Sequence, residues 1–474
     1  MMELKPSYEE FREGARKGYG YVPLYREILG DRVTPISLAE TFSDYVPLFL
    51  LESAEKGETW GRYSFLIFDV DEEIVMEGFQ DVIGSLERRF PPSSVYPSLD
   101  LPFLGGAVGF LSYDTVKTWE TTVPWREVDF PLAYFVRARR FIYVDHLKHR
   151  VGIVYVARTG DRGEYERAVE WIDRVCARIE KNVVTRSPGE EFSLGDSVRS
   201  NFTSSSFQEA VCAVQKLIEE GHASQVVISQ RFTVPYQGNP FLSYRFLRSL
   251  NPSPYLFYLK TSSFVMLGSS PEMLVKLEGG KVFTKPIAGT RRRIPGIDER
   301  AVIEELLADE KENAEHVMLL DLGRNDLGRV CELGTVCVEE FMKVERYSHV
   351  FHIVSTVSGK VRKDITPWRV LQACFPAGTV SGAPKVRAMQ IIEEIEPVAR
   401  GPYAGALGYV SFQGNVDTCI LIRSIFFAKG EARIQAGAGI VYDSLPEREY
   451  EETKSKAEAL LLALQSAEKG AILL

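Results

Sequence analysis

Segments with the character of strands and of helices follow one another in blocks along this chain, not in strict alternation. Aromatic and β-branched residues predict strands within 59–71, 107–113, 138–144 and 150–156. Only then does a helix follow, at 164–181, where apolar residues recur with a 3.6-residue period. A doubly wound parallel sheet needs a helix between successive strands, so the block order favours a layered α+β fold.

The same pattern continues after a segment of different composition. Residues 182–205 are rich in serine, glycine, threonine and charge and lack periodicity, which predicts a linker between an N-terminal region, 1–181, and a C-terminal region, 206–474. Capping boxes at Ser206 and Ser444 predict the starts of two helices. The other elements expected here are strands at 225–234, 264–267, 273–277, 404–412, 418–427 and 432–440, and helices at 298–320 and 386–394.

Composition and charge exclude several classes of protein. The net charge of the 474 residues is -9 and no basic stripe stands out, which argues against a nucleic-acid partner. The N-terminus lacks the apolar run of a signal peptide, and the most apolar stretch, 45–51, is too short to span a bilayer. The six cysteines show no CxxC spacing, which disfavours a zinc site or a disulfide framework. We therefore expect a cytoplasmic protein with reduced thiols.

Two of the predicted helices carry the same pair of carboxylates, three residues apart. One helix contains Glu312 and Glu315, and the other contains Glu449 and Glu452. Side chains at this spacing share a helix face, so four carboxylates would lie close together if the helices meet. Like charges at that range need an offset, and Mg2+ with oxygen ligands is the simplest one. The alternative is two solvated faces among 65 acidic residues, and the pattern alone favours it.

Several other segments of the second half have two interpretations each. The loop 375–385 packs small residues and two prolines before a helix, which suits either an anion held by backbone N–H groups or a tight packed turn. Gly437 and Gly439 within a strand indicate either close approach to a ligand or a bulge. Arg423 lies in a β-run and is either solvent-facing or a carboxylate clamp, and Lys456 could pair with Glu452 or reach a substrate.

Histidines are few, and two of the six flank the start of one predicted strand. These are His349 and His352, while His316 adjoins Glu315 but points off the glutamate face. A lone histidine in a strand is more often a core residue than a catalytic one. The histidines therefore leave the chemistry open.

Taken in order, these segments resemble the chorismate-utilising enzymes, and most closely the large subunits (component I) of anthranilate synthase. The resemblance covers essentially all of 205–465 and is sparser before it. It is carried by blocks at 286–291, 306–318, 321–328, 345–350, 375–385 and 449–453. Several blocks in sequence order are far more specific than any single motif.

The resemblance implies a sandwich of two packed β-sheets with helices outside, and an active site in the C-terminal region. It implies that chorismate and ammonia give anthranilate and pyruvate, with Mg2+ required. Glu315 and Glu452 resemble direct metal ligands, and Glu312 and Glu449 resemble the groups that hold metal-bound waters. The residues that resemble chorismate contacts are Gly289, Thr290, Tyr403, Arg423, Gly437, Ala438, Gly439 and Lys456. His352 and Thr379 resemble the groups near the departing hydroxyl, with His352 as the candidate acid.

Two positions distinguish among the reactions of this family. Relatives that add water carry lysine as the base where this chain has Gln225, and a carboxamide cannot deprotonate water. Aminodeoxychorismate synthases of the folate branch typically carry a nucleophilic lysine where this chain has Ala288. Both positions favour anthranilate formation, the first step of tryptophan biosynthesis, and leave aminodeoxychorismate synthase as the alternative.

The N-terminal half resembles the feedback site of the same family, at which tryptophan inhibits. The expected tryptophan contacts are Ser53, Pro254, Tyr255 and Leu256. The alternative for 50–53 is a strand that enters the core, and the alternative for the whole chain is a tryptophan-binding protein without catalysis. No Gly-x-Cys-x-Gly turn exposes a nucleophile, so we expect glutamine to be used only with a separate small subunit, a glutamine amidotransferase.

Overall fold

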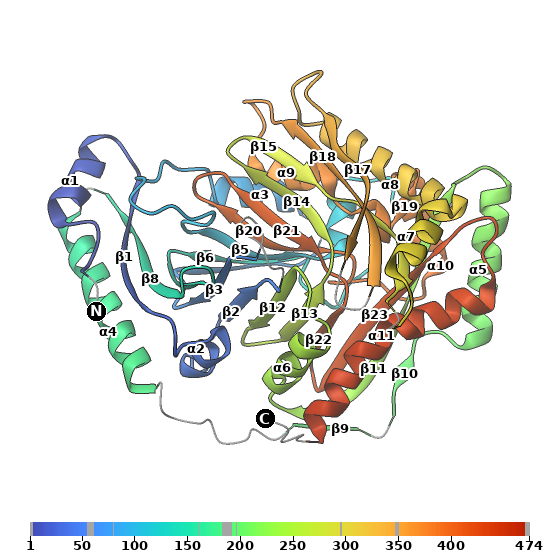
Figure 1. Ribbon diagram of the computed structural model, residues 1–474, viewed down its shortest axis with the longest axis horizontal. Helices are drawn as coiled ribbons and strands as arrows, with labels where there is room; N and C mark the ends of the chain where they lie inside the picture. The colour runs from blue at the N-terminus through green and yellow to red at the C-terminus, as the bar shows by residue number, and fades with distance from the viewer. Residues whose placement is uncertain are drawn as a thin grey trace.

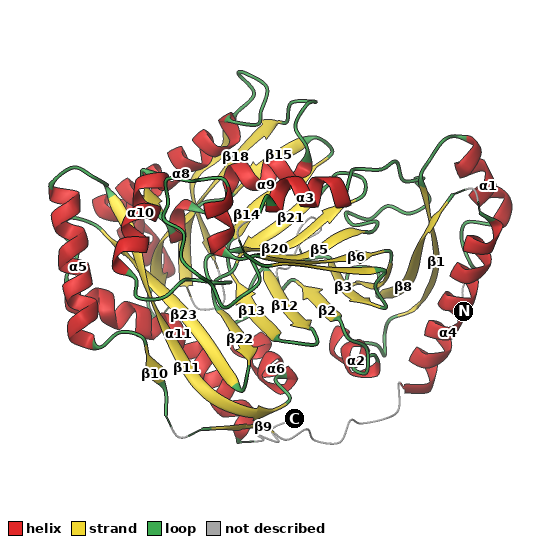
Figure 2. Cartoon of the chain, turned by 180° about the vertical axis from the view of Figure 1, so that it is seen from behind, coloured by secondary structure: helices red, strands yellow, loops and turns green. Residues whose placement is uncertain are grey.

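Two large β-sheets pack face to face in the computed structural model, with helices on the outer surfaces (Figures 1 and 2). All strand pairs within the sheets are antiparallel. The described residues are 3–54, 61–78, 80–159, 161–182, 192–195, 197–293, 296–346 and 350–469. The α+β sandwich expected from the sequence is therefore confirmed.

The first sheet has 13 strands within the described residues and combines both halves of the chain. Its order is β1 (Tyr21–Leu29), β8 (Arg150–Arg158), β7 (Arg140–Asp145), β3 (Tyr63–Phe68), β2 (Leu48–Glu52), β12 (Tyr255–Lys260), β13 (Val265–Ser270), β22 (Ser424–Ala428), β23 (Glu431–Ile440), β11 (Gln225–Gly238) and β10 (Arg199–Ser200). Two short strands, β9 (Phe192–Leu194) and β19 (Gly382–Ala383), also pair with β11.

The second sheet has ten strands within the same described residues and again joins the two halves. Its order is β16 (Ile287–Arg292), β18 (Val350–Lys360), β15 (Lys281–Thr284), β14 (Met273–Glu278), β21 (Val416–Ile420), β20 (Ala406–Ser411), β5 (Gly106–Leu111), β6 (Ala133–Ala138) and β4 (Glu72–Met76). A further strand, β17 (Cys337–Arg346), pairs with β18.

Helices cover both outer surfaces. They are α1 (Tyr8–Arg16), α2 (Pro35–Thr41), α3 (Val82–Arg89), α4 (Arg162–Asn182), α5 (Ser204–Glu219), α6 (Phe241–Leu250), α7 (Glu299–Ala308), α8 (Glu310–Gly328), α9 (Pro367–Cys374), α10 (Lys385–Ile395) and α11 (Pro446–Glu468), with 3-10 turns at η1 (Tyr113–Thr118) and η2 (Gly378–Val380). Apolar side chains of α4, α6 and α11 pack on the first sheet, and those of α3 and α9 pack on the second.

The alternation of side chains along β3 shows how the layers form. Phe65 and Ile67 face the second sheet, whereas Leu66 and Phe68 face the helices, because successive side chains point to opposite faces of a strand. The ring of Phe65 lies 6.5 Å from that of Tyr409 on the second sheet, in an edge-to-face arrangement. Aromatic side chains thus fill the space between the sheets.

Both sheets continue across the predicted linker. In the first sheet Leu256 of β12 lies opposite Glu52 of β2, and in the second Gly408 of β20 lies opposite Gly109 of β5. Residues 183–191 and 196 lie outside the described part of the chain, but β9 and β10 within 192–200 pair with β11. The division at 182–205 stays a prediction about the chain, while the two regions on either side share both sheets.

Two predicted helix starts differ from the structure. The capping box of α5 is formed by Thr203 and Ser206, three residues before the expected one, because Thr203 Oγ1 already accepts from the Ser206 N–H at 3.1 Å. At α11 the Ser444 hydroxyl accepts from the Val441 N–H instead of capping the helix, and Leu445 occupies the N-cap. The expectation of a capping box at Ser444 was wrong.

Two segments that were each predicted as one element form two elements in the structure. The helix expected over 298–320 is α7 followed by α8, because Asp309 ends the first and caps the second by accepting from the Lys311 and Glu312 N–H groups at 3.1 Å. The strand expected over 418–427 is β21 followed by β22. Arg423 therefore does not lie inside a strand but in a turn between the two, with φ of 52°.

Candidate functional site

The two helices that carry paired glutamates lie at the same end of the molecule (Figures 1 and 2). Glu312 and Glu315 lie near the start of α8, and Glu449 and Glu452 near the start of α11. Burial raises the pKa of the Glu315 carboxyl, and the charges of Glu312 and Glu452 raise it further. Burial also raises the pKa of Glu449, again with a contribution from Glu452. Carboxylates from segments about 140 positions apart in sequence therefore influence one another's pKa.

Each of the four carboxylates also has a partner within the protein. Arg291 Nη1 lies 3.1 Å from a Glu312 oxygen, and Lys456 Nζ lies 2.5 Å from a Glu452 oxygen. Glu315 accepts a hydrogen bond from Gln225 Nε2 at 3.1 Å, and the Ser444 hydroxyl lowers the pKa of Glu449. Within the described residues, no three acidic, histidine or cysteine side chains form a preassembled metal centre.

The donor set nevertheless suits a hard divalent cation. Carboxylate oxygens are the ligands that Mg2+ prefers, and the metal usually keeps several waters besides one or two carboxylates. Burial, with a smaller contribution from neighbouring carboxylates, raises the pKa of Glu315 and of Glu449, and a bound cation would favour the ionised form of both. Mg2+ binding therefore stays a prediction that the chemistry of these residues fits.

Two glycines of β23 allow other groups to approach the strand closely. A Cβ atom on Gly437 would lie 2.7 Å from Tyr403 Oη, and one on Gly439 would lie 2.4 Å from Gln225 Nε2. Lys456 Nζ donates to the Gly437 carbonyl at 2.9 Å. Ala438, between them, packs instead into the apolar cluster beneath α5 and α10, so its side chain faces away from this site. Of the predicted contacts on β23, the structure brings the two glycines together with Tyr403 and Lys456.

Arg423 lies at the same place through its turn between strands. Its Nη1 approaches the Lys456 carbonyl at 3.4 Å, and its own carbonyl accepts from the Ser269 N–H at 3.0 Å. Burial lowers the pKa of the guanidinium, while Tyr403 and Glu452 act to raise it. Among the residues that the structure describes, no carboxylate forms an ion pair with Arg423, so this partly desolvated guanidinium is suited to clamp an anionic ligand.

His352 faces the opposite strand of the second sheet, where β16 bulges. It is paired with Thr290, and the register shifts between Ala288 and Thr290 to leave Gly289 with φ of 71°. Its Nδ1 bonds to the Gly289 carbonyl at 3.1 Å, so that nitrogen carries the hydrogen. Burial, and then Arg423, lower the pKa of His352. A neutral imidazole accepts a proton more readily than it donates one, which weakens the prediction that His352 is the acid.

The structure adds a second acid that the sequence analysis missed. Glu272 is buried between β13 and β14, and burial raises its pKa to about 8, against the lowering effects of Thr379 and Lys456. Thr379 Oγ1 is buried and makes no hydrogen bond of normal geometry within the described residues. Both line a small cavity of about 30 Å³. A carboxylate in an apolar run, Ser270-Pro271-Glu272-Met273, was the signal in the sequence.

The predicted anion-binding loop, 375–385, is held against the same region by contacts with β11 and α8. Its residues Gly382 and Ala383 form β19, which pairs with Val226 and Gln225 at the start of β11. Lys385 Nζ forms a buried ion pair with Asp326 of α8 at 2.7 Å. The loop is thus tied to α8 and β11, and it carries Thr379 beside Glu272.

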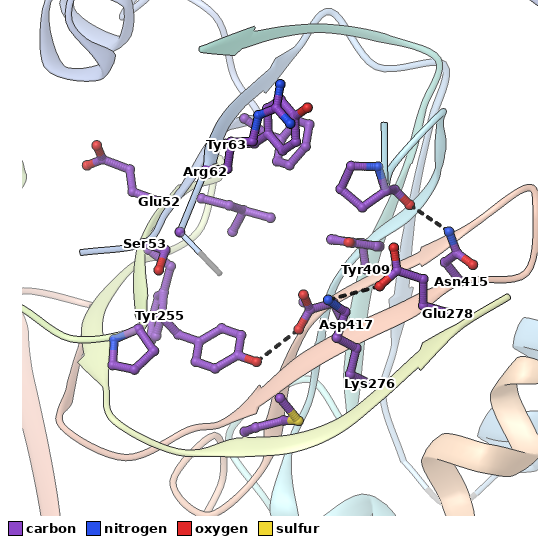
Figure 3. A pocket seen from close by; sticks show the side chains of 18 of the residues that line it. Glu52, Ser53, Arg62, Tyr63, Tyr255, Lys276, Glu278, Tyr409, Asn415 and Asp417 are labelled. Carbon is purple, nitrogen blue, oxygen red and sulfur yellow. Dashed lines mark hydrogen bonds and ion pairs between the residues drawn. The ribbon is translucent and has the colours of Figure 1, made fainter. Parts of the chain in front are cut away.

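A separate cavity of about 620 Å³ opens between β2, β12 and the second sheet (Figure 3). All four predicted tryptophan contacts line it: Ser53, Pro254, Tyr255 and Leu256. Tyr255 Oη bonds to Asp417 Oδ1 at 3.0 Å, and Lys276 lies 3.0 Å from Glu278. Glu52 points away from the cavity, towards Tyr244 and Arg248 (Figure 3). The cavity thus has apolar walls with charged groups of both signs.

Comparison with known proteins places the chain and its fold in one family. The sequence profile described as chorismate binding enzyme matches residues 48–462. Anthranilate synthase component 1 from Acetivibrio thermocellus is 44% identical over 98% of this chain and 99% of its own length, and that from Aquifex aeolicus is 44% identical over 99% of both. The crystal structure of anthranilate synthase component I from Streptococcus pneumoniae superposes with a TM-score of 0.75 at 35% identity, covering 91% of this chain and 98% of that one.

A more distant structure shares the architecture alone. The menaquinone-specific isochorismate synthase MenF from Escherichia coli superposes with a TM-score of 0.72 at 21% identity, covering 97% of this chain and 100% of that one. The chain belongs to the chorismate binding enzyme family, and within it to the anthranilate synthase component 1 proteins. It is therefore an enzyme that uses chorismate. No helix in the described part of the chain has the length and apolar character needed to cross a bilayer.

Proposed function

We propose that this chain is the Mg2+-dependent subunit that converts chorismate and ammonia to anthranilate and pyruvate, the first committed step towards tryptophan. The observation that carries the proposal is the electrostatic coupling of Glu315 on α8 to Glu452 on α11, beside Arg423 and Lys456. In a chain of this family, carboxylates that could hold a metal thus lie next to cationic side chains that could hold a carboxylate of the substrate.

The substrate is a dianion, and the site offers two kinds of group for it. Arg423 and Lys456 are suited to hold the enolpyruvyl carboxylate by charge-assisted hydrogen bonds. Glu315 and Glu452 would hold Mg2+, with Glu312 and Glu449 acting through metal-bound waters. When bound, the metal holds the ring carboxylate and withdraws electrons from the ring.

Proton transfer falls to Glu272 in this proposal, instead of His352. With a pKa of about 8, Glu272 is protonated at neutral pH and lies near Thr379, where it can donate to the departing ring hydroxyl. As the carbon–nitrogen bond forms, the ring carbon–oxygen bond breaks, and the proton of Glu272 leaves in water. The protonated amine then loses one proton, which restores the carboxyl form of Glu272. In the second step the ring carbon that bears the amino group loses its proton, and the bond between the ring and the enolpyruvyl oxygen breaks. A proton adds to the methylene carbon of the departing enolpyruvate, which gives pyruvate and an aromatic product.

Ammonium is the substrate that tests the proposal most directly. The purified chain, mixed with chorismate, Mg2+ and a high concentration of ammonium, is expected to form fluorescent anthranilate and an equal amount of pyruvate. Aminodeoxychorismate as the final product, or no turnover, would contradict the proposal.

Two further parts of the proposal concern partner and regulation. Ammonia comes from glutamine through a separate glutamine amidotransferase subunit, so the isolated chain should use ammonium but not glutamine. Tryptophan binds in the 620 Å³ cavity and inhibits, its indole against the apolar walls and its charged groups near side chains of opposite sign. Supporting this, the four residues expected from the sequence line one cavity. Calorimetric titration with tryptophan tests it, because a chain that does not bind tryptophan would contradict this part.

A further inference from the structure

Two cavities lie on opposite faces of the second sheet. The large one, of about 620 Å³, is the proposed tryptophan site, and the small one, of about 30 Å³, is lined by Glu272 and Thr379. Along the extended segment 283–287, the odd-numbered residues line the large cavity and the even-numbered residues line the small one. Successive side chains of extended backbone point to opposite faces, so the wall between the cavities is one layer of sheet here.

Met273, the first residue of β14, belongs to both sides of this wall. Of the described residues, it alone lines both cavities. Its chain neighbours divide between them, because Pro271 lines the large cavity whereas Glu272 and Leu274 line the small one. A methionine side chain is unbranched and adaptable, so it can change shape when a ligand packs against it. A ligand in the large cavity can therefore reach the surroundings of Glu272 through Met273.

The start of β14 is the part of the wall that can yield. Its register with β21 shifts between Met273 and Val275, which leaves Leu274 as the extra residue of a bulge. Both Met273 and Leu274 adjoin the small cavity. A close-packed interior is hard to compress, so a displaced backbone moves towards a cavity more easily than into packed atoms. Pressure on Met273 from the large cavity should therefore shift residues 272–274 towards the small one.

Glu272 would take part in such a shift because it is bonded to Met273. Its carboxyl lies beside Thr379. A proton donor acts only within hydrogen-bond reach of the atom that it protonates. A misplacement of about 1 Å can cost about 10²-fold in rate. A small movement of this backbone is therefore enough to inhibit, without any contact between tryptophan and chorismate.

We propose that tryptophan inhibits through Met273: its indole displaces this side chain towards the small cavity and so moves Glu272 out of reach of the departing hydroxyl. This role rests on the proposed function, in which tryptophan binds in the large cavity and Glu272 is the acid. Binding and inhibition should therefore be separable at Met273.

The test measures binding and inhibition separately in Met273→Ala, which shortens the side chain that transmits the displacement. Calorimetric titration gives the tryptophan concentration that saturates each protein, and anthranilate formation is then measured with and without that concentration. Saturation should lower the wild-type rate at least about tenfold, within the usual range of coupling between sites, but should leave Met273→Ala with more than about half of its own uninhibited rate. A saturated Met273→Ala chain inhibited as strongly as the wild type would overturn the inference.

Leu51 provides a matched control on the opposite wall. It belongs to β2 of the first sheet and lines the large cavity but not the small one. Leu51→Ala should bind tryptophan more weakly, because apolar contact is lost, yet should be inhibited at saturation as strongly as the wild type. Equal loss of inhibition at saturation in Leu51→Ala and Met273→Ala would also overturn the role of Met273.

A second substitution covers the case in which Met273→Ala does not fold, as judged by thermal unfolding, or does not bind tryptophan. Met273→Val also lacks the end of the methionine side chain and carries the same expectation. If Met273→Val binds no tryptophan either, Met273 is only a contact for the ligand and the inference fails.

Failure of this inference differs from failure of the proposed function. A wild-type chain that forms no anthranilate from chorismate and ammonium contradicts the proposed reaction. A wild-type chain that does not bind tryptophan, or binds it without inhibition, contradicts the proposed regulation. A wild-type chain inhibited by bound tryptophan, with a Met273→Ala variant inhibited to the same extent, contradicts only the role of Met273.

Discussion

Burial decides which single residues of this site carry protons at neutral pH. It raises the pKa of Glu272 to about 8 and lowers the pKa of His352, which reverses the roles that their types alone suggest. A carboxyl with such a pKa is a competent acid near pH 7, whereas a neutral imidazole is an acceptor. The two predictions for Glu272 follow from the burial of its side chain.

Replacing Glu272 with glutamine removes the proposed acid without changing its shape. We expect kcat to fall by about 10²-fold or more, because the departing hydroxyl then lacks a proton donor. In the wild type, kcat should decline as the pH rises through about 8, where Glu272 ionises. A pH profile of anthranilate formation measures both, and Glu339→Gln, on the exposed strand β17, is the control.

The same pKa shift has a consequence for stability. Unfolded, Glu272 ionises near 4.5, so between pH 4.5 and 8 the folded state binds the extra proton. The free energy of unfolding should therefore fall as the pH rises through this range, and less so in Glu272→Gln. Equal pH dependence of urea unfolding in both proteins would contradict the raised pKa.

A bulky side chain in the cavity of about 620 Å³ should weaken inhibition by tryptophan without changing catalysis. Ser53→Phe places a ring in the cavity that all four predicted contacts line, so tryptophan should need at least a tenfold higher concentration for half-maximal inhibition. The rate without tryptophan should stay within about twofold, because the substituted residue lies outside the catalytic cluster. Ser193→Phe, on the exposed face of β9, should leave inhibition as in the wild type. A Ser53→Phe chain inhibited normally would place tryptophan elsewhere.

At the scale of elements, a helix cap positions the paired glutamates of α8. Asp309 caps α8 and pairs with Arg291, which also contacts Glu312. The face of α8 that we propose binds Mg2+ therefore depends on one aspartate at the start of the helix. Asp298 caps α7 in the same way, and α7 carries none of the four glutamates.

The two caps make a matched pair for mutation. Asp309→Ala and Asp298→Ala should each lower the free energy of unfolding by about 1 kcal/mol. Only Asp309→Ala should raise the Mg2+ concentration needed for half-maximal rate, because it frays the turn that carries Glu312. Mg2+ titrations of anthranilate formation in both variants decide this, and an equal effect would refute the positioning role of Asp309.

At the scale of the whole molecule, a buried ion cluster joins the two halves of the chain. Lys117 of η1 is fully buried and lies 2.7 Å from Asp114 and 2.8 Å from Glu393 of α10. Burial raises the pKa of Glu393, against the lowering effect of Lys117. Arg126 Nε lies 3.8 Å from Glu393 and is partly exposed, so removing Lys117 would take away the close, fully buried cation of both carboxylates.

Lys117→Met should therefore destabilise the protein far more than a typical surface change. Breaking a buried pair costs about 3–5 kcal/mol, which should appear as a lower urea midpoint of unfolding. Lys454→Met, which breaks the exposed pair of α11 with Glu451, should leave that midpoint unchanged. A Lys117→Met midpoint equal to that of Lys454→Met would show that the cluster contributes little.

Much of this protein could be predicted from its sequence because the signals are local. Aromatic and β-branched residues predicted several of the strands, and a 3.6-residue period predicted the amphipathic helix α4. The three-residue spacing put Glu312 with Glu315 and Glu449 with Glu452 on shared faces. The lining of the second cavity by Ser53 and Tyr255 was also predicted, through the family resemblance.

Only the tertiary structure decided the properties that depend on distant segments. The hydrogen bond from Gln225 to Glu315 joins residues 90 positions apart. The left-handed backbone at Arg423 interrupts a segment whose sequence reads as one continuous strand. The raised pKa of Glu272 depends on the groups that surround it. Spacing along a chain fixes which side chains share one element, because backbone geometry repeats. Desolvation and Coulomb energy depend on distance in space, so they are defined only once the sheets and helices have packed.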